Sequence, residues 1–92
     1  MINAVVGRIS SAQVRAGRVL LRWNALDLAA AAKLGVATIR RAETVDGELP
    51  ITIANEAAIR RALENAGVEF IDANGGGEGV RLRKASIPKK RK

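Results

Sequence analysis

The chain has 92 residues, which is enough for one small domain with one modest hydrophobic core. It contains no cysteine and no histidine, so disulfides, zinc fingers and catalysis by either residue are excluded. Its net charge is +7 and its aromatic content only 2%, so we expect an aliphatic core and a polyanionic partner.

The positive charge is segregated along the chain. Residues 1–42 carry seven Lys and Arg against one acid, residues 43–83 carry four Arg against eight acids, and residues 84–92 carry five Lys and Arg. The first part is therefore predicted to face a polyanion and the acidic part to face away from it. The lack of disulfides favours a cytoplasmic protein, which a nucleic acid as the polyanionic partner would place at the nucleoid. No stretch reaches the roughly 18 apolar residues that span a bilayer, so no membrane is expected as a partner.

The first helix is predicted to begin near Ser10, after an N-terminal segment over residues 1–9. Ser10 and Gln13 have the spacing of a capping box, in which each side chain accepts the other residue's free backbone N–H. One face of this helix then carries Val14, Gly17, Arg18 and Leu21. An arginine in an otherwise apolar face requires a partner inside the protein.

Two short helices follow, separated by residues 33–35. Asn24 is a suitable N-cap for the first, over residues 25–32, whose apolar face is predicted to comprise Leu28, Ala31 and Ala32. The second helix covers residues 36–43, and its inward-facing side chains are predicted to be Ile39 and Ala42. Two short helices joined by a tight turn form the helix-turn-helix unit, whose second helix lies in the major groove of DNA.

The outward face of this second helix supplies candidate base-reading side chains. Arg41 can bond guanine O6 and N7 together, while Val36 and Ala37 can meet thymine methyl groups. Thr38 and Arg40 are better placed for phosphates or the edge of the groove. The pattern therefore predicts sequence-specific binding of double-stranded DNA.

A loop and a longer helix are predicted next. Residues 44–50 contain Asp-Gly and Pro and form the loop. Thr52 is a suitable N-cap for a helix over residues 53–66, which Gly67 ends and whose apolar face comprises Ile59, Ala62, Leu63 and Ala66. The neighbouring arginines Arg60 and Arg61 are expected to form a solvated face.

The periodicity then changes to that of a β-hairpin. Residues 68–71 and 80–83 are predicted to pair across a Gly-rich loop, which no helix follows and which is therefore not a phosphate loop. Val80 and Leu82 alternate with arginines, so one face of the second strand is expected to be buried.

A lone two-stranded hairpin is barely stable, so it must pack on the helices or pair with a second copy. The candidate dimer residues are Phe70, Ile71, Val80 and Leu82. Residues 84–92 are expected to be a basic, disordered tail beyond a single domain over residues 10–83.

Several runs resemble the phage-repressor-like (Cro/Xre-type) family of bacterial helix-turn-helix transcriptional regulators. In the helical part these are AQVRAGR (12–18), LLRWN (20–24), DLA (27–29) and ATIRRAE (37–43). The later runs AIRRALENAGVEFID (58–72) and GVRLR (79–83) resemble a compact branch with a C-terminal strand element. The resemblance covers about residues 10–83 and implies a mainly α repressor-like bundle of four to five helices with a short C-terminal hairpin.

The resemblance also implies roles for individual residues. The family's inward arginine pairs with the glutamate that ends the recognition helix, which here makes Arg18 and Glu43 a structural ion pair. Its backbone-clamping positions correspond to Asn24 and Ala25. Where the family usually has glycine in the turn, this chain has Lys33, and a positive φ there costs roughly 1 kcal/mol or more. The candidate DNA-binding residues are therefore Asn24, Lys33, Val36, Ala37, Thr38, Arg40 and Arg41.

We expect a dimeric transcriptional regulator, acting as a repressor, with no enzymatic activity, no cofactor and no metal. A DNA-binding antitoxin or a control protein of a mobile element has the same sequence features. The alternative from another class is a protein-interaction module, anti-activator or antitoxin-like, whose helix-turn-helix binds a second protein partner instead of DNA. RNA binding is disfavoured because the chain lacks stacking aromatic residues.

Overall fold

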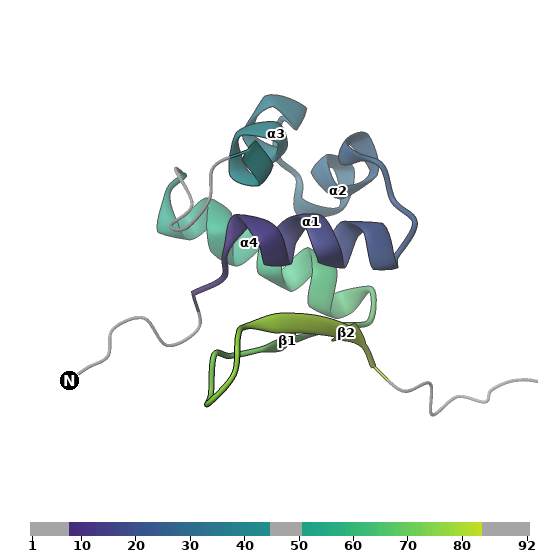
Figure 1. Cartoon of the computed structure of the whole chain (residues 1–92). Coiled ribbons are helices and arrows are strands. Elements are labelled where there is room, and N and C mark those ends of the chain that lie inside the picture. The colour runs from purple at the N-terminus through teal and green to yellow at the C-terminus, as the bar shows by residue number, and fades with distance from the viewer. Residues whose placement is uncertain (1–7, 45–50, 84–92) are drawn as a thin grey trace, which may run out of the picture.

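The computed structural model of the chain describes residues 8–44 and 51–83. These residues form four helices and an antiparallel hairpin in the predicted order: α1 (Ser11–Leu20), α2 (Ala25–Ala32), α3 (Val36–Thr44), α4 (Ile53–Asn65), β1 (Val68–Ile71) and β2 (Gly79–Leu82). Figure 1 shows the hairpin beneath α1 and α4, with α3 at the opposite end of the molecule. Thr44, predicted as the first residue of the loop over 44–50, instead belongs to the last turn of α3. The rest of that loop, residues 1–7 of the N-terminal segment and the basic tail lie outside the described residues.

The start of α1 is the predicted capping box. Ser10 Oγ accepts a hydrogen bond from the Gln13 backbone N–H at 3.2 Å, and Gln13 Oε1 accepts one from the Ser10 N–H at 2.9 Å. The amide nitrogen of the same buried Gln13 donates to the carbonyls of Ile71 at 3.3 Å and Gly79 at 3.0 Å. A residue recognised in the sequence only as a cap therefore also ties the hairpin to the helices.

The cap of α2 is confirmed, but one residue of its predicted apolar face is wrong. Asn24 Oδ1 accepts from the Asp27 N–H, and Asp27 Oδ2 accepts from the Asn24 N–H, both at 2.8 Å. Ala31 is exposed, and the buried residues are Leu28, Ala29 and Ala32. Since α2 packs against both α3 and α4, its buried arc is centred near Ala32, and Ala31 lies about 100° round the helix from there.

The core is aliphatic, as the composition predicts. Its largest fully buried hydrophobic side chains come from all four helices and β1: Val14, Leu28, Ile39, Ile59, Leu63 and Val68. The two aromatic residues, Trp23 and Phe70, are half-buried against this core. Gly17 lets α1 approach closely, because a Cβ there would lie 3.4 Å from both Leu63 Cδ1 and Val68 Cγ1.

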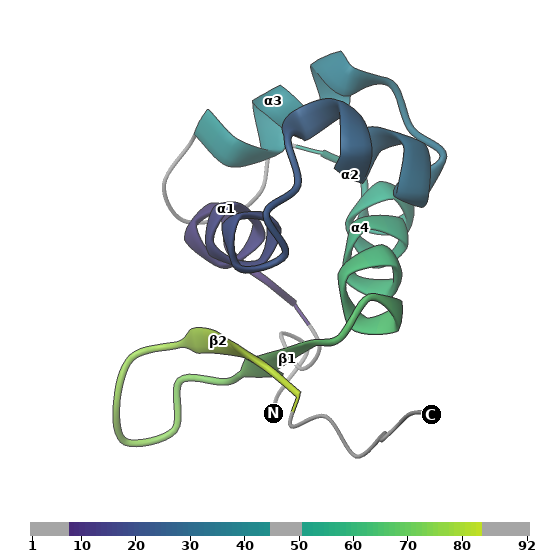
Figure 2. The same cartoon turned by 90° about the vertical axis from the view of Figure 1, so that its right-hand side faces the viewer.

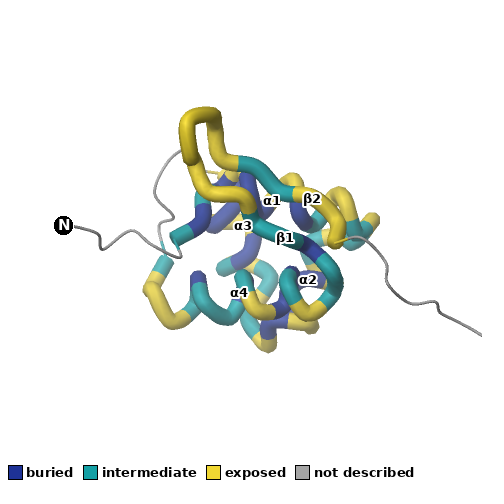
Figure 3. Tube along the Cα trace, turned by 90° about the horizontal axis from the view of Figure 1, so that it is seen from below, coloured by how far each residue is buried: buried dark blue, intermediate teal, exposed yellow. Residues whose placement is uncertain are grey.

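The hairpin differs in detail from the sequence prediction. Its second strand begins at Gly79 and ends at Leu82, with Phe70 opposite Val80 and Val68 opposite Leu82. Val68 is fully buried, yet Leu82 is 47% exposed, so the expected buried face of β2 is only partly covered. The reason is that α4 packs on β1, whereas α1 alone of the helices packs extensively on β2. Figure 3 shows the loop at the hairpin tip exposed.

The solvated face predicted for Arg60 and Arg61 is wrong for the first of the two. The Arg60 guanidinium carbon lies 5.0 Å from the centre of the Phe70 ring, within cation–π range. Its Nε also donates to Glu64 Oε2 at 2.9 Å. Arg61 is exposed, as expected. The sequence of α4 alone does not reveal the Arg60 contact, because Phe70 reaches it from the hairpin.

A buried ion pair that the sequence does not predict joins the N-terminal side of α1 to α4. Glu56, which is 3% exposed, accepts hydrogen bonds from Arg8 Nε on both carboxylate oxygens at 2.9 Å. It also accepts the backbone N–H of Ile9 at 2.9 Å. Glu56 therefore fixes the chain just before α1 onto the first turn of α4.

Candidate nucleic-acid interface

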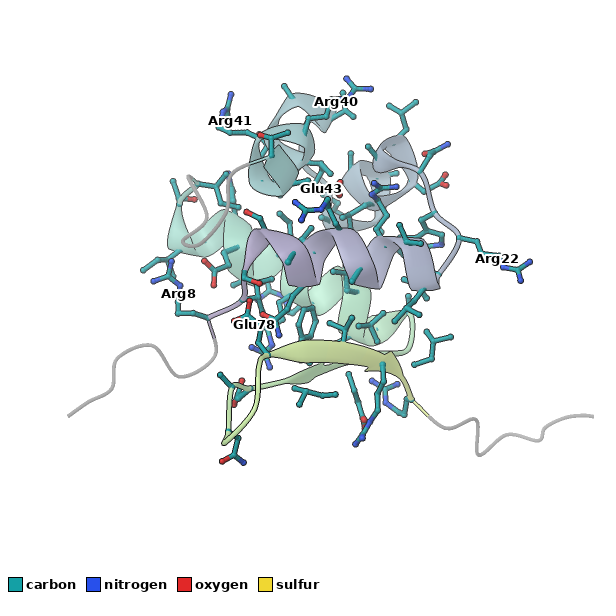
Figure 4. The ribbon with its side chains drawn as sticks, in the orientation of Figure 1. Arg8, Arg22, Arg40, Arg41, Glu43 and Glu78 are labelled. Atoms are coloured by element: carbon teal, nitrogen blue, oxygen red, sulfur yellow. The ribbon has the colours of Figure 1, made fainter. Side chains whose placement is uncertain are left out.

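The candidate site is the outward face of α3. Its inner face buries Ile39, Ala42 and Glu43. On the other side Ala37, Arg40 and Arg41 are exposed, while Val36 and Thr38 are half-buried. Figure 4 shows Arg40 and Arg41 pointing away from the rest of the protein, at the end opposite the hairpin. Four of the predicted base- or phosphate-contacting residues thus lie on one short, outward helix, together with Thr38 at its edge.

The two arginines of this face are not used by the fold. Within residues 8–44 and 51–83, the guanidinium groups of Arg40 and Arg41 make no hydrogen bond and no ion pair. The outward arginines of α3 are therefore available to an anionic ligand.

The opposite face of α3 is held by two arginines of α1. Arg18 donates from Nε to Glu43 Oε2 at 2.8 Å and from Nη2 to Glu43 Oε1 at 2.9 Å, which is a bidentate pair. Its third donor, Nη1, bonds the Trp23 carbonyl at 2.9 Å. Arg15 donates to the backbone carbonyl of Glu43. The pair that the family resemblance implies is thus present, and the position of α3 is set from its C-terminal turn.

This environment changes the acidity of Arg18. The hydrogen bonds to Glu43, supported by the charge of its carboxylate, raise the pKa of Arg18 above its ordinary value, although burial acts in the opposite direction. Folding therefore favours the charged form of the guanidinium. The apolar face of α1 contains the cation of Arg18 because the carboxylate that neutralises it comes from α3.

The junction between α2 and α3 contains the positive φ expected for Lys33. This residue follows the last turn of α2 with φ 60° and ψ 44°, in the left-handed region, and its N–H donates to the Ala30 carbonyl at 3.3 Å. The Gly35 carbonyl then accepts the first bond of α3, from the Thr38 N–H at 3.1 Å. The three residues between the helices therefore reverse the chain tightly, and α2 packs against α3.

The predicted residues outside α3 are more dispersed. Asn24 and Lys33 are exposed at opposite ends of α2, and Ala25 is half-buried. The side-chain oxygen of Asn24 is engaged in the capping box. Among the candidate dimer residues, Phe70 and Val80 are half-buried against the core, whereas Ile71 and Leu82 are 37% and 47% exposed.

The charge distribution in space differs from the distribution along the chain. Two of the seven cations in residues 1–42, Arg8 and Arg18, neutralise the buried carboxylates of Glu56 and Glu43. In the hairpin, Arg81 pairs with Glu69 at 2.6 Å. The acidic middle of the chain is thus partly neutralised from within. In residues 8–44 and 51–83, the cations without an ion pair include Arg22, Lys33, Arg40 and Arg41, on or beside α2 and α3, whereas Arg15, Arg61 and Arg83 lie elsewhere.

One exposed cation outside α3 has no signal in the sequence. Arg22, between α1 and α2, has φ 60° and is exposed, and Figure 4 shows its side chain pointing away from the protein. No sequence signal marks it, because arginine is not a residue typical of the left-handed region.

The described residues thus define a small, mainly helical domain of four helices with a C-terminal antiparallel hairpin. Comparison with protein-family models and with curated proteins finds no match to the chain. None of the helices in residues 8–44 and 51–83 has the length and apolar character needed to cross a bilayer.

Proposed function

We propose that α2 and α3 form a helix-turn-helix unit that binds double-stranded DNA sequence-specifically, and that the protein is a transcriptional regulator acting as a repressor. The observation that carries the proposal is the outward face of α3, where Arg40 and Arg41 are exposed and unpaired within the described residues. The same helix is fixed from behind by the Arg18–Glu43 pair. The resemblance to Cro/Xre-type regulators supports the same assignment.

The dimensions of α3 suit the major groove. Nine residues give a rod about 13 Å long, and the groove is about 12 Å wide, enough to admit one helix. The small side chain of Ala37 and the half-buried Val36 allow the start of α3 to approach the base edges. Arg41 then has the length and the planar donor pair that guanine O6 and N7 require. Arg40, on the same face, is placed for a phosphate.

Selection of binding sites from random duplex DNA tests this function, with the wild-type protein compared to Arg41→Ala. We expect a defined site for the wild type and relaxed preference at one base position for the variant, a change of about 1–3 kcal/mol in discrimination. Arg81→Ala is the matched control, because it removes one arginine from the hairpin at the opposite end and should leave the site unchanged. Removal of residues 84–92 should lower affinity for all sequences alike and flatten its salt dependence.

Failure of the wild-type protein to enrich any sequence would contradict sequence-specific DNA binding. That result would favour the protein-interaction module, for which the 61% exposed Leu26 at the start of α2 and the small residues of α3 provide an apolar surface.

We also infer that the protein binds DNA as a homodimer through its hairpin. Helix-turn-helix dimers read two half-sites about 34 Å apart, and Leu82 leaves apolar surface exposed on a two-stranded sheet. Sedimentation is expected to show a dimer at tens of micromolar. Leu82→Glu should give a monomer, whereas Ile53→Glu, at a similarly exposed apolar position on α4, should remain dimeric. A wild-type monomer at that concentration would count against the dimer.

A further inference from the structure

Two cationic residues hold a backbone conformation that L-amino acids rarely adopt. In the described part of the chain, the non-glycine residues with positive φ are Arg22 and Lys33, each at 60°. They bracket α2: Arg22 lies three residues before its first turn, and Lys33 follows its last residue. Both are exposed. Figure 2, viewed toward the end of α1, shows the connection to α2 running along the outside of the molecule.

Neither side chain makes a contact within the described fold that would offset the free-energy cost of this backbone conformation. Residues with a Cβ are strained in the left-handed region, and glycine holds it without that strain. Within residues 8–44 and 51–83, neither Arg22 nor Lys33 makes a side-chain hydrogen bond or an ion pair. The fold requires only the backbone conformation at these positions, which glycine would supply more easily. Strain of this kind that is maintained without an internal partner is concentrated at functional sites.

The two cations lie beyond opposite ends of a helix whose length is comparable to the major groove of the ligand already proposed. The eight residues of α2 rise about 12 Å, and the groove is about 12 Å wide. In a helix-turn-helix unit this first helix lies against the phosphate backbone while the second enters the groove. Cations at both ends of α2 would therefore meet different phosphates, on either side of the groove that α3 occupies.

We infer that Arg22 and Lys33 are phosphate-contacting residues that clamp α2 onto the DNA backbone, and that the chain retains cations in these two turns for that contact. The inference rests on the proposed DNA-binding function and adds Arg22, which the sequence did not indicate. Phosphate contacts carry no base information, so this clamp sets affinity and register while α3 sets sequence preference.

The test replaces each residue by glycine and measures thermal stability and DNA affinity on the same proteins. Arg22→Gly and Lys33→Gly relieve the backbone, so the melting temperature should stay the same or rise. The slope of log affinity against log salt should fall by about 1 per bound subunit, and so by about 2 for the dimer, with sequence preference unchanged. If the plots of log affinity against log salt for variant and wild type meet near 1 M salt, a fall of about 2 in slope corresponds to roughly 100-fold weaker binding at about 0.1 M. Arg22→Lys should bind nearly as the wild type does.

The probes are a duplex carrying the enriched site and a duplex of random sequence, since a phosphate contact affects both equally. Arg81→Gln, which removes a charge from the hairpin, should change neither slope. An unchanged salt slope in Arg22→Gly, or a lower melting temperature, would overturn the clamp while leaving the DNA-binding function intact. Absence of binding by the wild-type protein to both duplexes would instead overturn the function together with the clamp.

Discussion

Glu43→Ala should destabilise the domain by about 3–5 kcal/mol, which is a large share of the 5–15 kcal/mol that stabilises a typical native domain. The substitution removes the carboxylate that accepts two hydrogen bonds from Arg18 and leaves that guanidinium without its counter-charge. The cost should lie toward the lower end of the range, because the Arg18 side chain keeps 21% of its surface accessible to water. Urea unfolding followed by circular dichroism measures the change.

The double variant Arg18→Met with Glu43→Leu is the control for this prediction. Replacing both partners of a buried pair by apolar residues of similar volume is often neutral or stabilising, because no charge then remains to be desolvated. We expect most of the lost stability to return in the double variant. A loss below about 1 kcal/mol in Glu43→Ala would contradict a structural role for the pair.

The pH dependence of the same pair has a definite sign. Because hydrogen bonding to Glu43 raises the pKa of Arg18 in the folded protein, the contribution of this cation is complete below its unfolded pKa. It is lost only as the pH rises through the raised folded value, in strongly alkaline solution. Between pH 6 and pH 9, therefore, the difference in unfolding free energy between wild type and Arg18→Met should not change through titration of Arg18.

Glu56→Ala is the second substitution expected to have a large effect, about 2–4 kcal/mol of unfolding free energy. It would leave the buried backbone N–H of Ile9 without its acceptor and Arg8 without its carboxylate. The side chain of Arg8 is 25% accessible and can turn toward water, so the unsatisfied backbone group and the space left by Glu56 should account for most of the cost.

Glu56→Gln is the matched variant for this site. Its side-chain oxygen can still accept the Ile9 N–H, while the charge interaction with Arg8 is lost. We therefore expect Glu56→Gln to lower the free energy of unfolding by less than half as much as Glu56→Ala does. Equal destabilisation by glutamine and alanine would show that the charge, and not the backbone hydrogen bond, holds the chain before α1. Chemical denaturation of the three proteins in parallel distinguishes these outcomes.

The helices could be predicted closely from local signals. The caps at Ser10, Asn24 and Thr52 each engage the backbone N–H three residues later, as their sequence spacing indicates. These are contacts between residues three apart, so the sequence contains all the information that they need. The inward positions of Ile39 and Ala42 follow in the same way from helical periodicity.

Errors arose where a second element decides the environment of a residue. Ala31 was assigned to the core, but α3 and α4 cover a neighbouring arc of α2. Arg60 was assigned to solvent, but Phe70 from the hairpin lies 5.0 Å from its guanidinium carbon. Leu82 was expected to be buried, but its strand is the less covered one of the pair.

The sequence by itself determined the order of helices and strands, their caps and the outward position of Arg40 and Arg41, because each depends on residues within one turn of helix or one pair of strands. The tertiary structure alone decided that Glu56 neutralises Arg8 across 48 positions and that Phe70 lies against Arg60. Both contacts depend on which segments pack together, and packing between distant segments has no signature in local sequence.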